Sequence, residues 1–214
     1  MDYSKLPDGF RDVYQSIDNE VIWMHSKWLM YQQLFSDLED NTDLFNKTAG
    51  YFFGVVQRTF FEDALLGISR LIDPPRTMGK ENRSLAFLIE KLMSLGHSDL
   101  VKDLENDLEM INSISSPFRE WRNRKIAHSD LGTNLLVNSE RLPGITSNNV
   151  EEALEIIRQF MNRINGFFAD HETAYDHFVT ARGGRALLAK LRIANDIEEK
   201  KRKELKNMNR ANRE

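Results

Sequence analysis

FRDVYQSIDNEVIWMHSKWLMYQQLFSDL, residues 10–38, shows the helical periodicity that dominates this chain. Its apolar side chains recur every three, four or seven positions, at Val13, Ile17, Val21, Trp28, Tyr31 and Phe35. An α-helix completes one turn about every 3.6 residues, so this spacing places the apolar side chains on one face. The stretch therefore predicts a long helix with one buried side.

The same periodicity predicts a second long helix that is capped by Asn41 or Thr42. This helix should end near Asp73, because Pro74 and Pro75 disfavour helical backbone and lack amide donors. Its expected apolar face consists of Phe45, Phe52, Val56, Phe60, Leu65 and Leu71.

Shorter helices are expected next along the chain. Ser84 can cap a helix that Gly96 ends, and Ser98 or Asp99 can open the following one. Pro117 interrupts that helix, either as a kink or as a first-turn residue of a new helix. Helical segments thus account for most of the first half of the sequence.

Residues 131–149 are rich in Gly, Pro, Asn and Ser, which predicts one irregular loop. Helices are expected again over about 150–168 and from about Arg185 onward. We find no convincing set of strands. The predicted fold class is all-α, a bundle of long antiparallel helices over residues 1–197, followed by a basic tail at 198–214 that is frayed helix or disordered.

The composition is ordinary for a soluble globular protein, with 41% hydrophobic and 29% charged residues among 214. The sequence contains no Cys, which excludes disulfides, thiolate metal sites and a Cys nucleophile. The N-terminal residues lack a signal-peptide pattern, and the longest apolar run, 49–56, is too short to span a bilayer. We therefore expect a cytoplasmic protein with no membrane partner.

Gly50 and Gly54, within the apolar run at 49–56, permit close approach of another helix, either in the core or at a dimer seam.

FREWRNRKIAHSD, residues 118–130, concentrates positive charge in a chain whose net charge is −4. Its basic residues are Arg119, Arg122, Arg124 and Lys125, and they accompany a single His. The tail at 198–214 has seven basic residues against four Glu. Any contact with nucleic acid is therefore expected to be local to these two segments.

Helix geometry gives a specific expectation for Arg122 and His128. If the helix were regular, Trp121 and Phe118 would face inward, and Arg122 and His128 would flank them about 120° apart and about 9 Å apart along the axis. Three arrangements could bring both to one ligand: a curled Arg side chain, an unwound helix, or a second copy that completes the site across a two-fold axis. The residues alone leave these open.

Arg and His form a chemically sensible pair for cleavage of an RNA phosphodiester. RNA supplies its own nucleophile, the ribose 2′-hydroxyl, and a His near its pKa can accept or donate the proton. An Arg matches phosphate oxygens and stabilises negative charge that develops on them. Asn123 could orient that Arg. The alternative is structural, in which His128 caps a helix end and Asp130 pairs with an Arg.

RNRKIAH, residues 122–128, resembles the defining motif of the HEPN superfamily: an Arg, a polar residue and then a His. GISRLIDPPRT (67–77), SLAFLIEKL (84–92) and PFREWRNRKIAHSD (117–130) resemble, in that order, blocks of the AbiU-like HEPN branch, which is linked to abortive phage infection. This resemblance implies a HEPN-like helical bundle. Some HEPN toxins carry a modifiable Tyr two residues after the His, whereas this chain has Asp130.

The resemblance also implies an activity, since many HEPN domains are dimeric, metal-independent endoribonucleases with Arg and His from both protomers in one cleft. The implied catalytic residues are Arg122 and His128, with Asn123 in a supporting catalytic role. The positive charge of Arg119, Arg124 and Lys125 makes these three the expected substrate-binding residues. The implied partners are RNA, a second copy and an antitoxin protein, in phage defence or a toxin–antitoxin system, with no cofactor and no metal. The alternative function is a non-catalytic helical module that binds nucleic acid, a nucleotide or a partner protein.

Three other motifs have structural interpretations. Residues 170–177 gather acidic and His side chains but lack an i,i+4 His pair, so we interpret them as a polar helix end rather than a metal site. Arg70 and Asp73 suit an ion pair that closes a helix, with a contribution to the site as the alternative. RGGR, residues 182–185, suits a hinge between helices.

Overall fold

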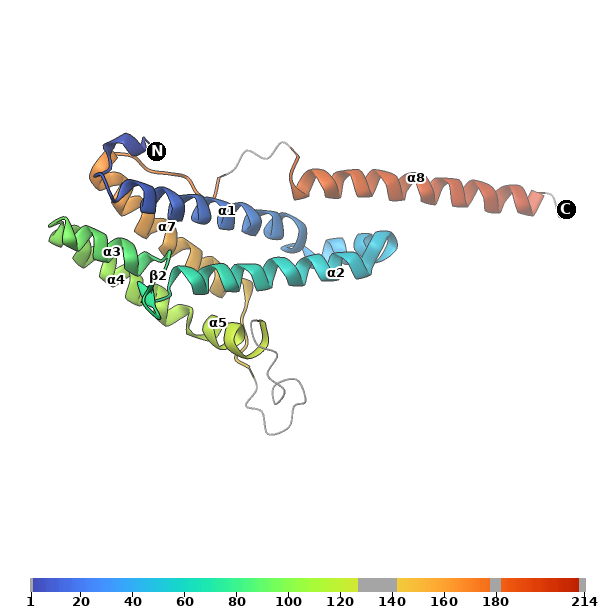
Figure 1. Cartoon of the computed structure of the whole chain (residues 1–214). Coiled ribbons are helices and arrows are strands. Elements are labelled where there is room, and N and C mark those ends of the chain that lie inside the picture. Colours follow the sequence, from blue (N-terminus) through green and yellow to red (C-terminus); the bar gives the residue numbers. More distant parts are fainter. Residues whose placement is uncertain (1, 127–141, 178–181, 212–214) are drawn as a thin grey trace. The chain divides into compact units, whose positions relative to one another are not determined.

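The computed structural model describes residues 2–126, 142–177 and 182–211. In chain order its elements are η1 (Tyr3–Lys5), α1 (Arg11–Phe35), α2 (Leu38–Leu71), β1 (Arg76–Thr77), β2 (Lys80–Glu81), α3 (Leu85–Ser94), α4 (Ser98–Ile114), α5 (Ser116–Trp121), η2 (Arg122–Ile126), α7 (Ser147–Ala169) and α8 (Gly184–Ala211). The all-α prediction is confirmed, because the described strands form only one two-stranded sheet (Figure 1).

The chain divides into two compact units. The first comprises Met1–Lys27 and Glu62–Phe178, and the second comprises Trp28–Phe61 and Val179–Glu214. Helices α1 and α2 therefore each contribute residues to both units.

In the first unit, α1 and α2 run antiparallel. Arg70 reaches Glu20, and Asp63 pairs with Lys27, so residue numbers fall on one helix as they rise on the other. A Cβ at Gly67 would lie 2.9 Å from Met24 Sδ, so any larger residue there would require the Met24 side chain to move. The expected inward face of α1 is buried except at Val13, which is half-buried.

Helices α3, α4 and α7 complete the first unit, with α4 packed against both of the others (Figure 1). The expected starts of α3 and α4 are confirmed. Ser84 is the N-cap residue of α3, although its side chain makes no capping hydrogen bond. Helix α4 begins at Ser98, with His97 as its N-cap residue. Pro117 lies in the first turn of α5, so of its two interpretations the new helix is correct. Between α4 and α7, Arg163 Nε donates to the buried Asp107 carboxylate at 2.6 Å.

Three tyrosine hydroxyls anchor a buried polar network in this unit. The carboxylate of Asp18, which is 2% exposed, accepts hydrogen bonds from the hydroxyls of Tyr3 and Tyr175. Tyr14 donates to Asn165 Oδ1 on α7 at 2.6 Å. Burial, as the main cause, raises the pKa of each of these tyrosines, so the hydroxyls stay protonated donors. The network ties α1 to α7 and to the segment after it.

Two helix starts and one pair of strands differ from the sequence prediction. Helix α2 begins at Leu38, before the expected cap at Asn41 or Thr42. Helix α7 begins at Ser147, inside the expected loop at 131–149, because Thr146 and Asn149 form a reciprocal capping box. Residues 131–141 of that loop lie outside the described residues. The hairpin β1–β2 was not predicted; Met78 and Gly79 both take positive φ at its turn, at 50° and 76°.

The second unit contains a kink in α2 at Ala49, whose φ of −162° and ψ of 62° are not helical. The kink changes the phase of the helix, so Phe53 is buried and stacks on Phe45 at 4.2 Å between ring centroids, while Phe52 is 58% exposed. The prediction that Phe52 faces the core is therefore wrong. Tyr51 and Val55 are also exposed, and a Cβ at Gly54 would contact nothing within 4 Å. Close helix approach at Gly54 is therefore not seen among the described residues.

Helix α8 contacts the ends of α1 and α2 that belong to the second unit. Arg192 Nη2 donates to Asn41 Oδ1 at 2.8 Å, and Lys47 pairs with Glu199 at 3.2 Å. A Cβ at Gly184 would lie 3.0 Å from Leu34 Cγ, which explains a glycine in the RGGR motif at this contact. Helix α8 continues into the basic tail at 198–214, and its last described residue is Ala211.

Candidate functional site

The basic stretch at 118–130 begins where the α-helix α5 gives way to a π-helical turn. Helix α5 ends at Trp121, and η2, a π turn, covers Arg122–Ile126. Phe118 anchors α5 in the core, and Trp121 Nε1 donates to the carbonyl of Pro143 at 2.8 Å. A π turn rotates less per residue than an α-helix, so the angles expected for a regular helix do not hold beyond Arg122. π turns are rare in proteins overall, and those that occur often lie at functional sites.

Arg122 is held by Ser69, near the carboxyl end of α2, and by Asp73, two residues beyond that helix. Its Nη1 donates to Asp73 Oδ1 at 2.9 Å and to the carbonyl of Ser69 at 3.4 Å. Its Nε donates to Asn123 Oδ1 at 3.2 Å. The side chains of Arg122 and Asp73 are 24% and 28% exposed, so the pair is partly shielded yet open to a ligand.

The pairing of Asp73 corrects one sequence expectation. Arg70 and Asp73 were expected to pair with each other across one helical turn. Instead Arg70 Nη2 contacts Glu20 Oε1 at 3.0 Å, while Asp73 contacts Arg122. The alternative interpretation, in which Asp73 contributes to the candidate site, agrees with these contacts.

Arg119 and Arg124, two of the predicted substrate-binding residues, have protein partners. Arg119 Nη2 donates to the carbonyl of Ile72 and to Asn112 Oδ1, the latter at 2.9 Å. Arg124 Nη1 pairs with Glu120 Oε1 at 2.7 Å, one helical turn away. The Arg119 contacts join α5 to Ile72, which follows α2, and to α4. The Arg124 ion pair joins η2 to α5.

Lys125, the third of that set, places Nζ 4.2 Å from the centroid of the Trp121 ring, a cation–π contact. His128 lies outside the described residues, and so does Asp130. Of the predicted site, the structure therefore brings together Arg122 and Asn123 and adds Asp73, which sequence reasoning had assigned to another pair.

A hollow of about 250 Å³ lies beside Asp73 in the same unit. Its walls include Arg70, Arg83, Glu20 and Asn82. Glu20 binds both arginines, Arg70 through Oε1 at 3.0 Å and Arg83 through Oε2 at 2.7 Å. Sequence reasoning missed this cluster because its members lie on separate segments; the RLIDPP motif was its one visible signal.

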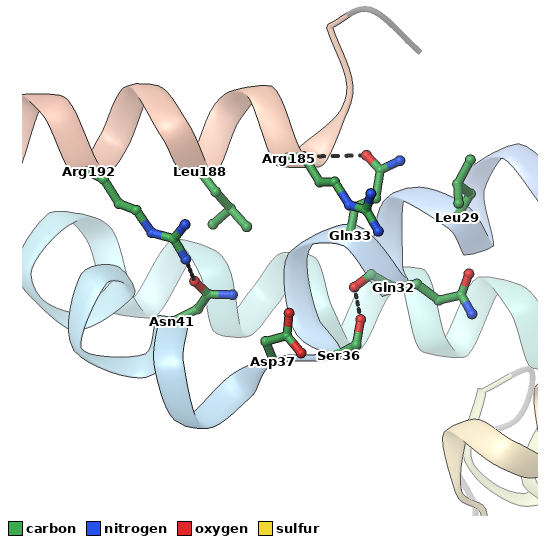
Figure 2. A pocket seen from close by; sticks show the side chains of 9 residues that line it. All are labelled: Leu29, Gln32, Gln33, Ser36, Asp37, Asn41, Arg185, Leu188 and Arg192. Carbon is green, nitrogen blue, oxygen red and sulfur yellow. Dashed lines mark hydrogen bonds between the residues drawn. The ribbon is translucent and has the colours of Figure 1, made fainter. Parts of the chain in front are cut away.

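A larger cavity of about 440 Å³ lies in the second unit, between α8 and the adjacent ends of α1 and α2 (Figure 2). Arg185 and Arg192 enter it from α8. Asp37, in the turn before α2, and Asn41, near the start of α2, line it from the other side. The guanidinium of Arg192 is bound by Asn41. None of the predicted site residues that the structure describes lines this cavity, and sequence reasoning did not identify it.

The residues at 170–177 form a packed polar end to α7. Asp170 takes a left-handed conformation as the C-cap, Tyr175 is fully buried, and Asp176 binds Arg158. Within the described ranges, no group of three or more His, Cys, Asp or Glu side chains is arranged to hold a metal ion. In the same ranges no helix is both long enough and apolar enough to cross a membrane.

His25, to which the sequence assigned no role, is buried beside Tyr175 with ring centroids 5.8 Å apart. Its Nε2 has no hydrogen-bond partner among the described residues. Burial, and then the positive charge of Arg158, lowers the pKa of His25 to about 4. The imidazole is therefore neutral near pH 7.

Comparison with known proteins supports the resemblance seen in the motifs. A family model of the HEPN class, described as AbiU2, matches residues 8–187 and so covers most of the chain. No significant match was found among curated proteins or among solved structures.

Proposed function

Because the chain belongs to the AbiU2 family of HEPN domains, we propose that it is an endoribonuclease that cleaves RNA without a metal ion. The observation that carries this proposal is the fixed orientation of Arg122. Asp73 and the carbonyl of Ser69 hold its guanidinium at the start of a π turn, and the side chain remains partly exposed. A preoriented guanidinium stabilises charge on a phosphate without reorganisation during the reaction.

In this mechanism the ribose 2′-hydroxyl of RNA attacks the adjacent phosphorus. One His128 side chain accepts the hydroxyl proton, and a protonated His128, its copy in the dimer proposed below, gives a proton to the leaving 5′-oxygen. Arg122 stabilises the negative charge on the phosphate oxygens. Asn123 contacts Arg122 Nε and helps to orient it. A 2′-oxygen–phosphorus bond forms as the 5′-oxygen–phosphorus bond breaks, which yields a 2′,3′-cyclic phosphate and a 5′-hydroxyl end.

The proposed active form is a homodimer in which two copies of the segment at 122–128 share one cleft. A two-fold axis brings each motif opposite its copy, so a second Arg and a second His become available to one phosphate. We place this activity in the cytoplasm, in abortive phage infection or a toxin–antitoxin system, where an antitoxin protein would restrain it.

The test compares wild-type protein with His128→Ala and Arg122→Ala on a mixed RNA substrate in excess EDTA. We expect cleavage by wild type and loss of cleavage in both variants, while far-ultraviolet circular dichroism stays helical. His177→Ala serves as the control, because its side chain is 81% exposed and lies in the segment that follows α7. Equal cleavage by His128→Ala contradicts the proposal, and RNA binding without any turnover by wild type indicates the binding module instead.

A further inference from the structure

We propose that the hollow formed by Arg70, Arg83, Glu20 and Asn82 binds a backbone phosphate of the RNA substrate next to the phosphate that Arg122 holds. This inference rests on the proposed function, because it extends the same site along the RNA chain. It concerns four side chains that neither the motif nor the family match assigns to a role.

The two arginines are held in place by one carboxylate. Glu20, whose side chain is 19% exposed, binds Arg70 through one oxygen and Arg83 through the other. A guanidinium has five N–H donors, and these ion pairs occupy one terminal nitrogen of each Arg. Arg83 Nη1 also donates to Ser16 Oγ at 3.4 Å, a long hydrogen bond. The side chains of Arg70 and Arg83 are 53% and 51% exposed, so both remain accessible to a ligand.

The donors of the hollow suit an anion. Its own charges balance, with Arg70 and Arg83 against Glu20 and Asp73. Because Arg122 pairs with Asp73, the hollow together with that ion pair has one net positive charge. Forked guanidinium donors match the geometry of phosphate oxygens better than they match a halide or a neutral ligand. A phosphodiester can therefore bridge Arg70 and Arg83 without displacing Glu20.

Asp73 connects this hollow to the candidate catalytic arginine. It lines the hollow and also accepts the hydrogen bond from Arg122 Nη1 at 2.9 Å. Asn82 fixes the adjoining wall, because its Nδ2 donates to the carbonyl of Pro74 at 2.7 Å and to Thr77 Oγ1 at 2.8 Å. An RNA strand with one phosphate at Arg122 can place a neighbouring phosphate in the hollow.

The experiment measures binding of a single-stranded RNA oligonucleotide with 2′-O-methyl groups, which cannot be cleaved by 2′-hydroxyl attack. Fluorescence anisotropy gives Kd at several salt concentrations for wild type and for Arg70→Gln/Arg83→Gln. We expect Kd to rise about tenfold in the double variant, because the charge-assisted hydrogen bonds to the phosphate can no longer form. The slope of log K against log salt should fall by about 0.7, since the protein then neutralises one phosphate fewer.

Arg76→Gln/Lys80→Gln is the matched control, because it removes the same charge from the neighbouring hairpin. Arg76 binds Glu90 through both carboxylate oxygens at 2.6 Å and does not line the hollow. Its Kd and salt slope should stay near wild type. Single Arg83→Gln, which keeps the ion pair of Arg70 with Glu20, should shift Kd in the same direction even if the double variant folds poorly. Unchanged Kd in Arg83→Gln, or an equal loss of affinity in the control, overturns the inference.

Titration with a 5′-mononucleotide separates a chain phosphate from a free one. We expect Arg83→Gln to weaken RNA binding much more than mononucleotide binding; equal losses of affinity for both contradict the assignment to an RNA backbone.

The proposed function and the phosphate subsite can be refuted separately. Arginine-dependent binding of RNA without cleavage refutes the proposed function alone, whereas wild-type KM for cleavage in Arg83→Gln refutes the phosphate subsite alone.

Discussion

At the scale of single residues, the ion pair between Asp73 and Arg122 is the feature on which the proposed chemistry depends. The two residues are 49 positions apart in the sequence, and their side chains are 24–28% exposed. A pair this exposed contributes about 1 kcal/mol or less to stability. Its main consequence is therefore the orientation of the guanidinium.

Asp73→Asn should lower kcat for RNA cleavage by roughly 10–100-fold with little change in KM, because Arg122 loses its orientation rather than its charge. The free energy of unfolding should change by about 1 kcal/mol or less. Asp63→Asn is the control, since Asp63 lies on α2, ten residues before Asp73, but pairs with Lys27. Steady-state kinetics and urea unfolding measure the two effects, and equal decreases in kcat in both variants would refute a specific role for Asp73.

His25 gives a second prediction, on stability against pH. Its pKa is about 4 in the folded chain and 6.5 when unperturbed, so the unfolded chain takes up the proton first as pH falls. The free energy of unfolding should therefore decline below about pH 6.5, by roughly 3 kcal/mol at pH 4 from His25 alone.

Urea unfolding at pH 7 and near pH 4 checks this, with His25→Gln and the exposed His177→Gln compared. We expect the loss of stability on acidification to be smaller in His25→Gln than in wild type, and unchanged in His177→Gln. The same pH dependence in all three proteins would show that His25 is not buried in neutral form.

At the scale of elements, the kink in α2 determines which phenylalanines are in the core. Phe53→Ala should cost about 3–5 kcal/mol, because the side chain is 5% exposed and stacks on Phe45. Phe52→Ala should cost much less, since that ring is 58% exposed. Urea unfolding of the two variants measures the difference; a larger destabilisation for Phe52 would mean that the helix continues through Ala49 without the change of phase.

Local signals in the sequence predicted the elements better than the contacts between them. Ser84, Ser98 and Pro117 mark helix starts by their own backbone preferences, so these starts were predictable. The kink at Ala49 carries no Pro, and the adjacent Gly50 was interpreted as a site of close helix approach rather than as a kink, so the phase of Phe52 was predicted wrongly. The Met78–Gly79 turn was missed because its flanking strands have only two residues each.

The candidate site was predictable only in part. Arg122 and Asn123 were found because they belong to one short motif. Asp73 has Arg70 one turn away, and a rule based on helical spacing prefers that local partner. Only the fold reveals that Glu20 takes Arg70 instead, which leaves Asp73 to Arg122.

At the scale of the whole molecule, the proposed dimer makes a prediction about mass. Multi-angle light scattering at micromolar concentration should give twice the chain mass of 24.9 kDa. Dilution to a monomer should abolish RNA cleavage, because each cleft needs both copies. A monomer that cleaves RNA at full rate would contradict the shared cleft. Arg122 and His128 of one chain would then have to act on the same phosphate without a second copy.

The central claim is that RNA is cleaved by its own 2′-hydroxyl, and one measurement tests it most directly. Wild-type protein in excess EDTA is given an RNA and the same RNA with a 2′-deoxy sugar at the cleaved nucleotide. The proposal predicts cleavage of the first to a 2′,3′-cyclic phosphate and a 5′-hydroxyl end, and no cleavage of the second at that position. Equal cleavage of both, or loss of all cleavage in EDTA that returns with added Mg²⁺, would contradict it.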